Sequence, residues 1–238
     1  MTTITKSDIK LIKSLSVKKF RAETGLFTVE GEKMVREALE SGFELVSLWR
    51  RDEIGEEAMA RISNLSSPSP VLAVLRQPAP EVFSKPERGL CIGLDSVRDP
   101  GNLGTILRIA DWFGVSAVYA GEGTVETFNP KVIQSSMGSI FRVKVINCNL
   151  SEVCDAFSKE GREVVGTFLG GESIYSAELS SDSLLVMGNE ADGIGKDVAS
   201  QVCRRITIPS FARQGAGAES LNVAVATAVC LSEFRRRI

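Results

Sequence analysis

The sequence predicts an α/β fold in which a parallel sheet, covered by helices on both faces, follows a smaller α/β unit. From residue 89 onward, near-continuous apolar segments alternate with helical patterns, which is typical of buried parallel strands. The segment QPAPEVFSKPERG, with three prolines in thirteen residues, separates this region from the preceding one and resembles a linker. The 238 residues, 43% of them hydrophobic, suffice for two domains of unequal size.

The first unit is expected to span residues 1–80 and to begin with a basic helix over roughly 7–15. Strand LFTVEG, helix GEKMVREALESG, strand FELVSLW, helix EEAMARISNL and strand PVLAVLR follow in this order. Each segment has the apolar period of its element. The pattern predicts a small β-α-β-α-β unit, followed by a linker over 81–88.

The second domain is expected to span residues 89–238. Strand GLCIGLD precedes a helix from Asn102, strand SAVYAG precedes helix NPKVIQSSMGS, and strand RVKVINC precedes helix SEVCDAFSKEG. Strands EVVGTFL and SLLVMGNE, a helix after Gly193, strand RITIPS and a long apolar helix from Ser220 to Arg237 complete the domain. Ligands of such sheets bind where loops leave the carboxyl ends of strands. Three glycine-rich loops, DPGNLG, GNEADGIG and SFARQGAGAES, lie at such positions.

Composition excludes several kinds of chemistry. The chain has no histidine, which removes Ser-His-Asp triads, Cys-His dyads and mixed Cys/His zinc sites, and no metal is expected. Five cysteines without a C-x-x-C pattern favour reduced, mostly buried thiols in a cytoplasmic protein. No apolar run approaches ~18 residues, so neither secretion nor membrane insertion is indicated.

Charge is unevenly distributed, although the net charge is only −2. Residues 1–21 contain six Lys or Arg residues against one acid, Asp8. Such a cluster is typical of a phosphate-binding surface, and also of an ordinary solvated helix.

Taken one at a time, the three loops are ordinary. DPGNLG does not supply G-x-G-x-x-G, and in GNEADGIGKD Ile194 stands where a P-loop requires lysine. Each loop alone is typical of a tight strand-to-helix turn. At ~100° per residue, Arg108 points away from the apolar face of its helix and is predicted to be a surface residue. That face consists of Leu103, Ile106, Leu107, Ala110 and Phe113.

Taken together, three segments resemble, in order and spacing, the three motifs of the SpoU (TrmH-type) RNA 2'-O-ribose methyltransferases. They are DPGNLGTILRIADWFGV, LLVMGNEADGIG and ITIPSFARQGAGAESLNVAVATAV. The resemblance covers Gly89 to Ile238, and the N-terminal unit resembles more loosely the small RNA-binding domain of many members. It implies an S-adenosylmethionine-dependent enzyme with a trefoil knot, an exception among protein folds. It also implies a homodimer in which the partner completes each active site.

The resemblance also implies site residues. Those implied to be catalytic are Asn102, Arg108, Glu190, Ser220 and Asn222. Those implied to hold S-adenosylmethionine are Thr167, Gly188, Asn189, Ile208 and Leu221. The family assigns Arg108 the part of base, but a guanidinium resists deprotonation. Binding the phosphate beside the target ribose, and stabilising charge on the 2'-oxygen, suits Arg108 better.

Two further expectations concern the last motif. Ser220 is expected to cap the final helix, and Asn222, at an otherwise apolar helix start, needs a specific polar partner. Ten residues separate Pro209 from Ser220, more than in compact versions of the motif. RQGAGAE is therefore expected to form a longer, mobile lip over the cofactor.

RNA is the expected partner, with Lys18, Lys19 and Arg21 as candidate phosphate contacts. The N-terminal unit favours rRNA, because minimal tRNA enzymes of the family lack it. Three alternatives stay open: a tRNA 2'-O-methyltransferase, a non-catalytic RNA-binding or ribosome-assembly protein that retains the knot, and an unrelated nucleotide-binding α/β protein. Neither DNA nor a membrane is expected as a partner.

Overall fold

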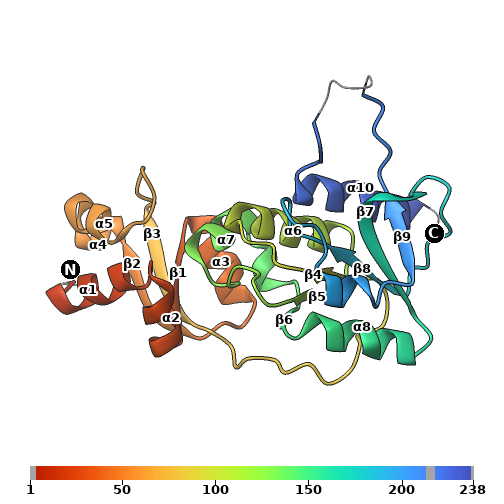
Figure 1. The fold of residues 1–238 in the computed structure, drawn as a ribbon. Helices are drawn as coiled ribbons and strands as arrows, with labels where there is room; N and C mark the ends of the chain where they lie inside the picture. The colour runs from red at the N-terminus through yellow and green to blue at the C-terminus, as the bar shows by residue number, and fades with distance from the viewer. Residues whose placement is uncertain (1–3, 213–217, 237–238) are drawn as a thin grey trace. The chain divides into compact units, whose positions relative to one another are not determined.

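The computed structural model describes residues 4–212 and 218–236, and the chain divides into two compact units (Figure 1). Unit 1 comprises Met1–Ala79 and Glu126–Arg142, and unit 2 comprises Pro80–Val125 and Val143–Ile238. The sequence pattern placed the segment Glu126–Arg142 in the second domain. In the structure it lies in unit 1, so the first unit consists of two separate stretches of chain.

Unit 1 is built on a three-stranded antiparallel sheet with strand order β1-β3-β2. The strands are β1 (Leu26–Glu30), β2 (Leu45–Arg50) and β3 (Val71–Arg76). The helices are α1 (Lys6–Ser14), α2 (Lys18–Thr24), α3 (Glu32–Glu40), α4 (Arg51–Ile54) and α5 (Glu56–Ile62). Ile12, Met59 and Leu72, from α1, α5 and β3, belong to one buried apolar cluster. The predicted elements occur in the predicted order, and the short helices α2 and α4 are additional.

The later stretch of unit 1 carries helix α7 (Pro130–Ser136) and the 3-10 helix η1 (Ser139–Phe141). The ring of Phe128 lies 4.6 Å, centroid to centroid, from that of Phe27 in β1. Arg142 Nη1 lies 2.6 Å from Glu37 Oε2 in α3. These contacts attach the later stretch to β1 and α3.

Arg21 is a buried residue of unit 1 and not part of its surface. Its side chain is 2% exposed, and its Nε donates to Glu126 Oε1 at 2.5 Å. Its Nη1 donates to the carbonyl of Leu15 at 2.6 Å, which fixes the corner between α1 and α2. The prediction that Arg21 contacts RNA phosphates is therefore wrong, because its guanidinium is enclosed and its charge is already paired.

Unit 2 contains a six-stranded parallel sheet in the order β6-β5-β4-β8-β7-β9. The strands are β4 (Cys91–Leu94), β5 (Ala117–Ala120), β6 (Val145–Asn147), β7 (Glu163–Ser173), β8 (Ser183–Met187) and β9 (Arg204–Thr207). Every residue of β4, β5 and β8 is buried, which explains their near-continuous apolar sequence. The predicted parallel sheet is confirmed.

Helices cover both faces of this sheet (Figure 1). Helices α6 (Pro100–Trp112) and α10 (Val223–Arg236) lie on one face, and α8 (Leu150–Lys159) lies on the other. The short helix α9 (Lys196–Ala199) contacts α8. None of the described helices combines the length and apolarity that a bilayer crossing needs.

Helices α6 and α10 lie side by side and run in the same direction. Near their first turns, Asn222 donates to Asn102. At their other ends, Arg235 donates to the carbonyls of Phe113 and Gly114 at 2.7 and 2.6 Å. A cation placed there satisfies the otherwise unpaired carbonyls at the end of α6.

Both helices begin where a side chain caps them, and neither begins where the sequence pattern indicated. Helix α6 starts at Pro100 instead of Asn102, and Asp99 is its N-cap. Helix α10 starts at Val223, and the Oδ1 of Asn222 accepts from the N–H groups of Ala224 and Val225 at 3.0 and 3.3 Å. The prediction that Ser220 caps this helix is therefore wrong, because Asn222 occupies that position.

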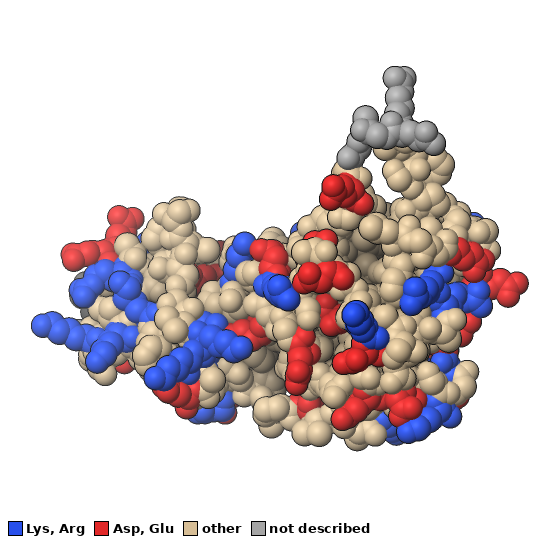
Figure 2. All heavy atoms as spheres, in the orientation of Figure 1, with Lys and Arg blue, Asp and Glu red and all other residues tan. Residues whose placement is uncertain are grey.

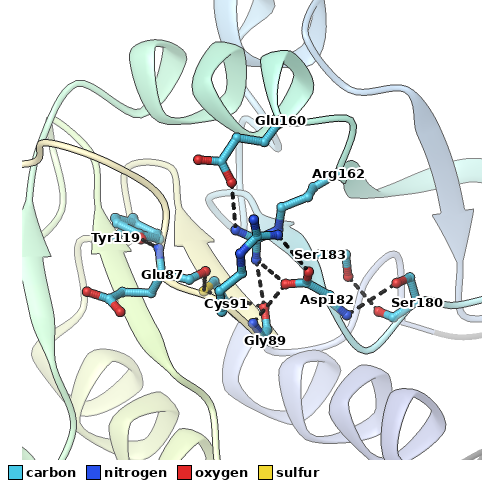
Figure 3. Close-up of polar contacts among 10 residues, drawn as sticks. Glu87, Gly89, Cys91, Tyr119, Glu160, Arg162, Ser180, Asp182 and Ser183 are labelled. Atoms are coloured by element: carbon cyan, nitrogen blue, oxygen red, sulfur yellow. Dashed lines mark hydrogen bonds and ion pairs between the residues drawn. The ribbon is translucent and has the colours of Figure 1, made fainter.

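The amino-terminal edge of the parallel sheet is closed by Arg162, as Figure 3 shows. Its side chain is 4% exposed, and its Nη2 lies 2.6 Å from Asp182 Oδ1 and donates to the Gly89 carbonyl at 2.9 Å. Its guanidinium carbon lies 4.1 Å from the centroid of the Phe157 ring. Burial alone would raise the pKa of Asp182, but the Gly89 N–H and the Arg162 cation lower it overall. The charge of Arg162 is thus compensated inside the protein.

The five cysteines are free thiols, and burial raises the pKa of four of them. The pKa is raised to about 11 for Cys91 and Cys148 and to about 12 for Cys154 and Cys230. These four thiols stay protonated near neutral pH and act as small apolar groups. Cys203 is exposed.

Arg21→Ala is expected to lower the free energy of unfolding by about 3 kcal/mol, because it leaves the Glu126 carboxylate without its partner. Urea unfolding followed by circular dichroism measures the change. Lys18→Ala, at an exposed position of the same helix, is the control and should stay within about 0.5 kcal/mol of the unmodified protein. Equal stabilities of the two variants would contradict the buried role of Arg21.

Candidate active site at the carboxyl ends of the parallel strands

The three glycine-rich loops follow β4, β8 and β9 at the carboxyl edge of the sheet. The chain runs from β4 outward to β5 and β6 on one side, and places β8, β7 and β9 on the other. β4 and β8 are therefore neighbours at the point where the strand order reverses. In open parallel sheets this is where a crevice for ligands forms.

Three of the predicted catalytic residues form one hydrogen-bonded chain at this edge. The Nδ2 of Asn222 donates to the Oδ1 of Asn102 at 2.9 Å, and the Nδ2 of Asn102 donates to the Oε1 of Glu190. A carboxylate only accepts, and the backbone N–H groups capped by Asn222 only donate, so the network fixes the orientation of both amides. The expected polar partner of Asn222 is thus Asn102.

Asn102 is also held through its backbone. Its N–H donates to the Oδ1 of Asp99 at 2.9 Å, within the first turn of α6. Sequence reasoning did not single out Asp99, although Asp before Pro-Gly at a helix start is a recognisable capping signal. Asp99 and Glu190 together determine where the side chain of Asn102 lies.

The loop after β8 closes on itself. Asn189 and Gly193 exchange two backbone hydrogen bonds of 3.0 and 2.9 Å, and Gly193 has a φ of +69°. A Cβ on Gly188 would lie 2.3 Å from the carbonyl carbon of Gly193, so only glycine fits there. The Asn189 side chain serves this loop, since its Oδ1 accepts from the N–H of Ala191 at 2.8 Å.

The remaining residues predicted to hold the cofactor lie around partly exposed apolar surface. Leu221 is 48% exposed, Ile208 is half-buried, and Thr167 Oγ1 donates to the Val186 carbonyl at 3.3 Å. Leu169, which sequence reasoning missed, is 83% exposed, and its carbonyl accepts from Thr207 at 3.4 Å. The only sequence signal for it is an apolar residue before two glycines at a strand end.

This surface fits S-adenosylmethionine. The β7–β9 register shifts between Thr167 and Glu172, so residues 168–171 leave the regular pairing beside β9. Leu169 in β7 and Leu221 just before α10 present exposed apolar side chains, and an adenine ring suits an apolar pocket. Among the described residues, no group of three or more carboxylates or thiols is placed to hold a metal ion.

Arg108 does not join the amide chain. It is exposed on the outer side of α6 with Thr105 and Trp112, as the helical period predicts. It lies six residues after Asn102, which at ~100° per residue places it about a third of a turn away. No described residue forms a hydrogen bond or ion pair with its guanidinium, so the group is open to an anion.

The other predicted positions are separate from this cluster. Ser220 is exposed and precedes the first residue of α10 by three positions. Residues 213–217 of the expected lip RQGAGAE lie outside the described residues. Lys18 and Lys19 are exposed on α2 of unit 1.

Models of known protein families match both parts of the chain. A model described as the SpoU rRNA Methylase family matches residues 89–232. A second, described as the MRM3-like substrate binding domain, matches residues 6–74.

Similar proteins match over nearly the whole length. The 23S rRNA (guanosine(2553)-2'-O)-methyltransferase RlmP of Bacillus subtilis is 34% identical, covering 95% of each chain. A structure of a TrmH-family protein from Porphyromonas gingivalis has a TM-score of 0.88, 37% identity and full coverage of both chains. An AdoMet-bound rRNA methyltransferase from Sinorhizobium meliloti has a TM-score of 0.87 and 30% identity, covering 100% of this chain and 98% of the other.

These likenesses confirm the predicted α/β class, and the parallel sheet is consistent with the predicted trefoil knot. The family model spans more than half of the residues, and the Bacillus subtilis relative is more than 30% identical over nearly the whole chain. The chain therefore belongs to the SpoU rRNA methylase family.

Proposed function

We propose that this protein transfers a methyl group from S-adenosylmethionine to the 2'-hydroxyl of a ribose in ribosomal RNA. The observation that carries this is the hydrogen-bonded chain Asn222–Asn102–Glu190 at the carboxyl edge of the sheet of a SpoU-family protein. An RNA-binding protein without activity would have no need to keep this chain. A relative that covers 95% of both chains acts on 23S rRNA, which favours rRNA over tRNA.

The cofactor supplies an electrophilic methyl group. In this chain, Leu221, Ile208 and Leu169 provide the apolar surface that would cover its adenine ring and methionine chain. Gly188 and Asn189 would approach it through the backbone, and Thr167 borders the same strand end. These residues bind and orient, and positioning of two reactants alone is worth up to ~7–11 kcal/mol of a barrier.

The amide chain orients the ribose. Asn102 and Asn222 each use one of two amide protons inside the chain, so each keeps one N–H for a ribose oxygen. The second oxygen of Glu190 can accept a hydrogen bond from the 2'-hydroxyl, and it can take up the proton that this hydroxyl loses when its oxygen gains the methyl group. In this way the chain presents donors and an acceptor in fixed directions. Ser220, predicted to act here, would be an exposed contact to RNA.

The proposed role of Arg108 is to bind and stabilise negative charge. An exposed guanidinium can bind a phosphate in a bidentate manner, and it can stabilise negative charge that develops on the 2'-oxygen. Because a guanidinium stays protonated, this role needs no proton transfer from Arg108.

The basic surface of α1 and α2 is proposed to contact RNA phosphates. Figure 2 shows Lys and Arg side chains gathered over these helices, and Lys18 and Lys19 are exposed there. Val17 and Phe20, exposed beside them, offer apolar surface to bases. The match to a substrate binding domain over residues 6–74 supports this assignment.

We also propose a cytoplasmic homodimer, formed around Trp112 at the end of α6 and Val225 on α10, in which Arg108 stays open to the RNA. Trp112 is 86% exposed on α6, and Val225 is exposed on α10. A tryptophan exposed on a packed helix layer suits a self-complementary interface, where aromatic residues are enriched. Free, mostly buried thiols suit a reducing compartment.

Arg108→Ala is expected to abolish turnover, with a loss of about 100-fold or more, while the Kd of S-adenosylmethionine stays within about twofold. Methyl transfer to rRNA and calorimetric titration of the cofactor measure the two effects. Arg88→Ala is the matched control, because Arg88 is an exposed arginine that pairs with Asp182 at the opposite edge of the sheet. Substantial activity in Arg108→Ala would refute the assignment.

Lys18→Ala and Lys19→Ala should each reduce the slope of log K against log salt by about 0.7–0.9, the value for one released counterion. Filter binding of rRNA fragments at several salt concentrations gives the slope. Lys159→Ala, a surface lysine on α8 that pairs with Asp155, should leave the slope unchanged. An unchanged slope in the Lys18 and Lys19 variants would show that RNA phosphates lie elsewhere.

Trp112→Glu is expected to convert the dimer to a monomer, because it places a charge in the centre of the apolar interface. Sedimentation velocity at micromolar concentration measures the state. Val82→Glu is the control: Val82 is 86% exposed, as is Trp112, but lies in the segment before β4. A dimer that persists in Trp112→Glu would place the interface on another surface.

A further inference from the structure

We infer that Asp95 is the positioning residue of the active site, because its carboxylate holds the loop that carries Gly188 and Glu190. Asp95 directly follows β4, and its backbone N–H donates to the Met187 carbonyl at the end of β8 at 2.9 Å. Its Oδ2 accepts from the backbone N–H of Gly195 at 2.7 Å. Sequence periodicity treats Asp95 only as the polar end of a strand.

The other end of the loop, at Asn189, is attached to Ser96, the residue after Asp95. The Nδ2 of Asn189 donates to the Ser96 carbonyl at 2.8 Å. Ser96 has a φ of +59°, a conformation that non-glycine residues seldom adopt and that needs support from its surroundings. Its one hydroxyl proton gives that support, with the Glu122 carbonyl at 3.1 Å and Asp95 Oδ1 at 3.3 Å as its two acceptors within reach. Residues 95 and 96 thus hold both ends of the loop, at 189 and 195.

Between these ends, the loop behaves as one body. The paired backbone of Asn189 and Gly193 closes it, and the Asn189 carboxamide caps its inner turn by accepting from Ala191 and Asp192. The other contacts of the loop lie before Gly195: Asn189 with Ser96, Glu190 with Asn102, and the exposed pair of Asp192 with Arg98. Loss of the Asp95–Gly195 bond would therefore free the end of the loop at Gly195 and loosen the segment that carries Glu190.

Loss of the Asp95–Gly195 bond would affect the reacting groups through Glu190. Glu190 lies on this loop and accepts from Asn102, so rotation of the loop moves the acceptor that sets the direction of the Asn102 amide. Gly188, at the loop's first residue, moves with it. In this proposal Asp95 acts through the backbone N–H of Gly195, which its carboxylate holds.

The fit at Gly195 is close. A Cβ at this position would lie 3.2 Å from Asp95 Oδ2, tighter than most side-chain contacts. A hydrogen bond from a backbone N–H to an ionised carboxylate is about twice as strong as one between neutral groups. The contact is therefore short and charge-assisted, and it requires an acceptor oxygen at the end of β4.

The test compares Asp95→Ala with Asp95→Asn in the full-length protein. Asp95→Ala removes the acceptor and should raise the Kd of S-adenosylmethionine about tenfold and lower kcat by at least as much. Asp95→Asn keeps an oxygen in the same place and should recover most of both losses. Hydrogen exchange should accelerate in peptides covering 188–195 of Asp95→Ala, with little change in Tm. Asp192→Ala is the control. Asp192 lies on the same loop, but its ion pair with Arg98, at 3.6 Å, is exposed to solvent and contributes little.

Unchanged exchange and Kd in Asp95→Ala would overturn the inference, and so would an Asp95→Asn variant as defective as Asp95→Ala. Should Asp95→Ala fail to fold, Asp95→Ser, too short to reach Gly195, answers the same question. The activity readouts rest on the proposed function, whereas the exchange measurement does not. Unmodified protein that binds no S-adenosylmethionine would refute the proposed function, and loop exchange would still decide the role of Asp95.

Discussion

One directional run of hydrogen bonds holds the carboxyl end of unit 2 together. It starts at the backbone N–H groups of α10, passes through Asn222 and Asn102, and ends on the Glu190 carboxylate. The positive end of a helix dipole and a carboxylate are natural end points for such a chain. Its members are separated by 88 and 120 residues of sequence, so the site exists only when the whole unit has folded. The same bonds align the starts of α6 and α10, which then pack side by side across one face of the sheet.

Much of this arrangement could be predicted from sequence. Strands β4, β5 and β8 are almost entirely apolar, Ser183 excepted, because they are buried on both faces. The outward direction of Arg108 follows from the helical period alone. The meeting of Asn102, Glu190 and Asn222 could not come from periodicity, and was anticipated only because three individually weak motifs occur together in one order.

What the sequence could not predict depends on distant contacts. Arg21 stands in a run of lysines, and only Glu126, 105 residues later, makes it a core residue. Ser220 and Asn222 are both good capping residues, and the bond to Asn102 decides between them. The placement of Glu126–Arg142 with unit 1 rests on aromatic and ionic contacts that no local pattern reveals. Asp95 is likewise unremarkable until Gly195 lies against it.

The buried Arg162 gives the two ends of the same strands different tolerance to change. At the amino end, the buried guanidinium of Arg162 pairs with Asp182 and donates to the Gly89 carbonyl, so removal of Asp182 leaves a buried charge without its nearest partner. At the carboxyl end, the amides and the carboxylate keep bonding capacity that folding does not use. The effects of natural or laboratory substitutions should therefore differ between the two ends of the strands. Changes at the amino end reduce the amount of folded protein in the cell, and changes at the carboxyl end leave its abundance normal and alter its chemistry.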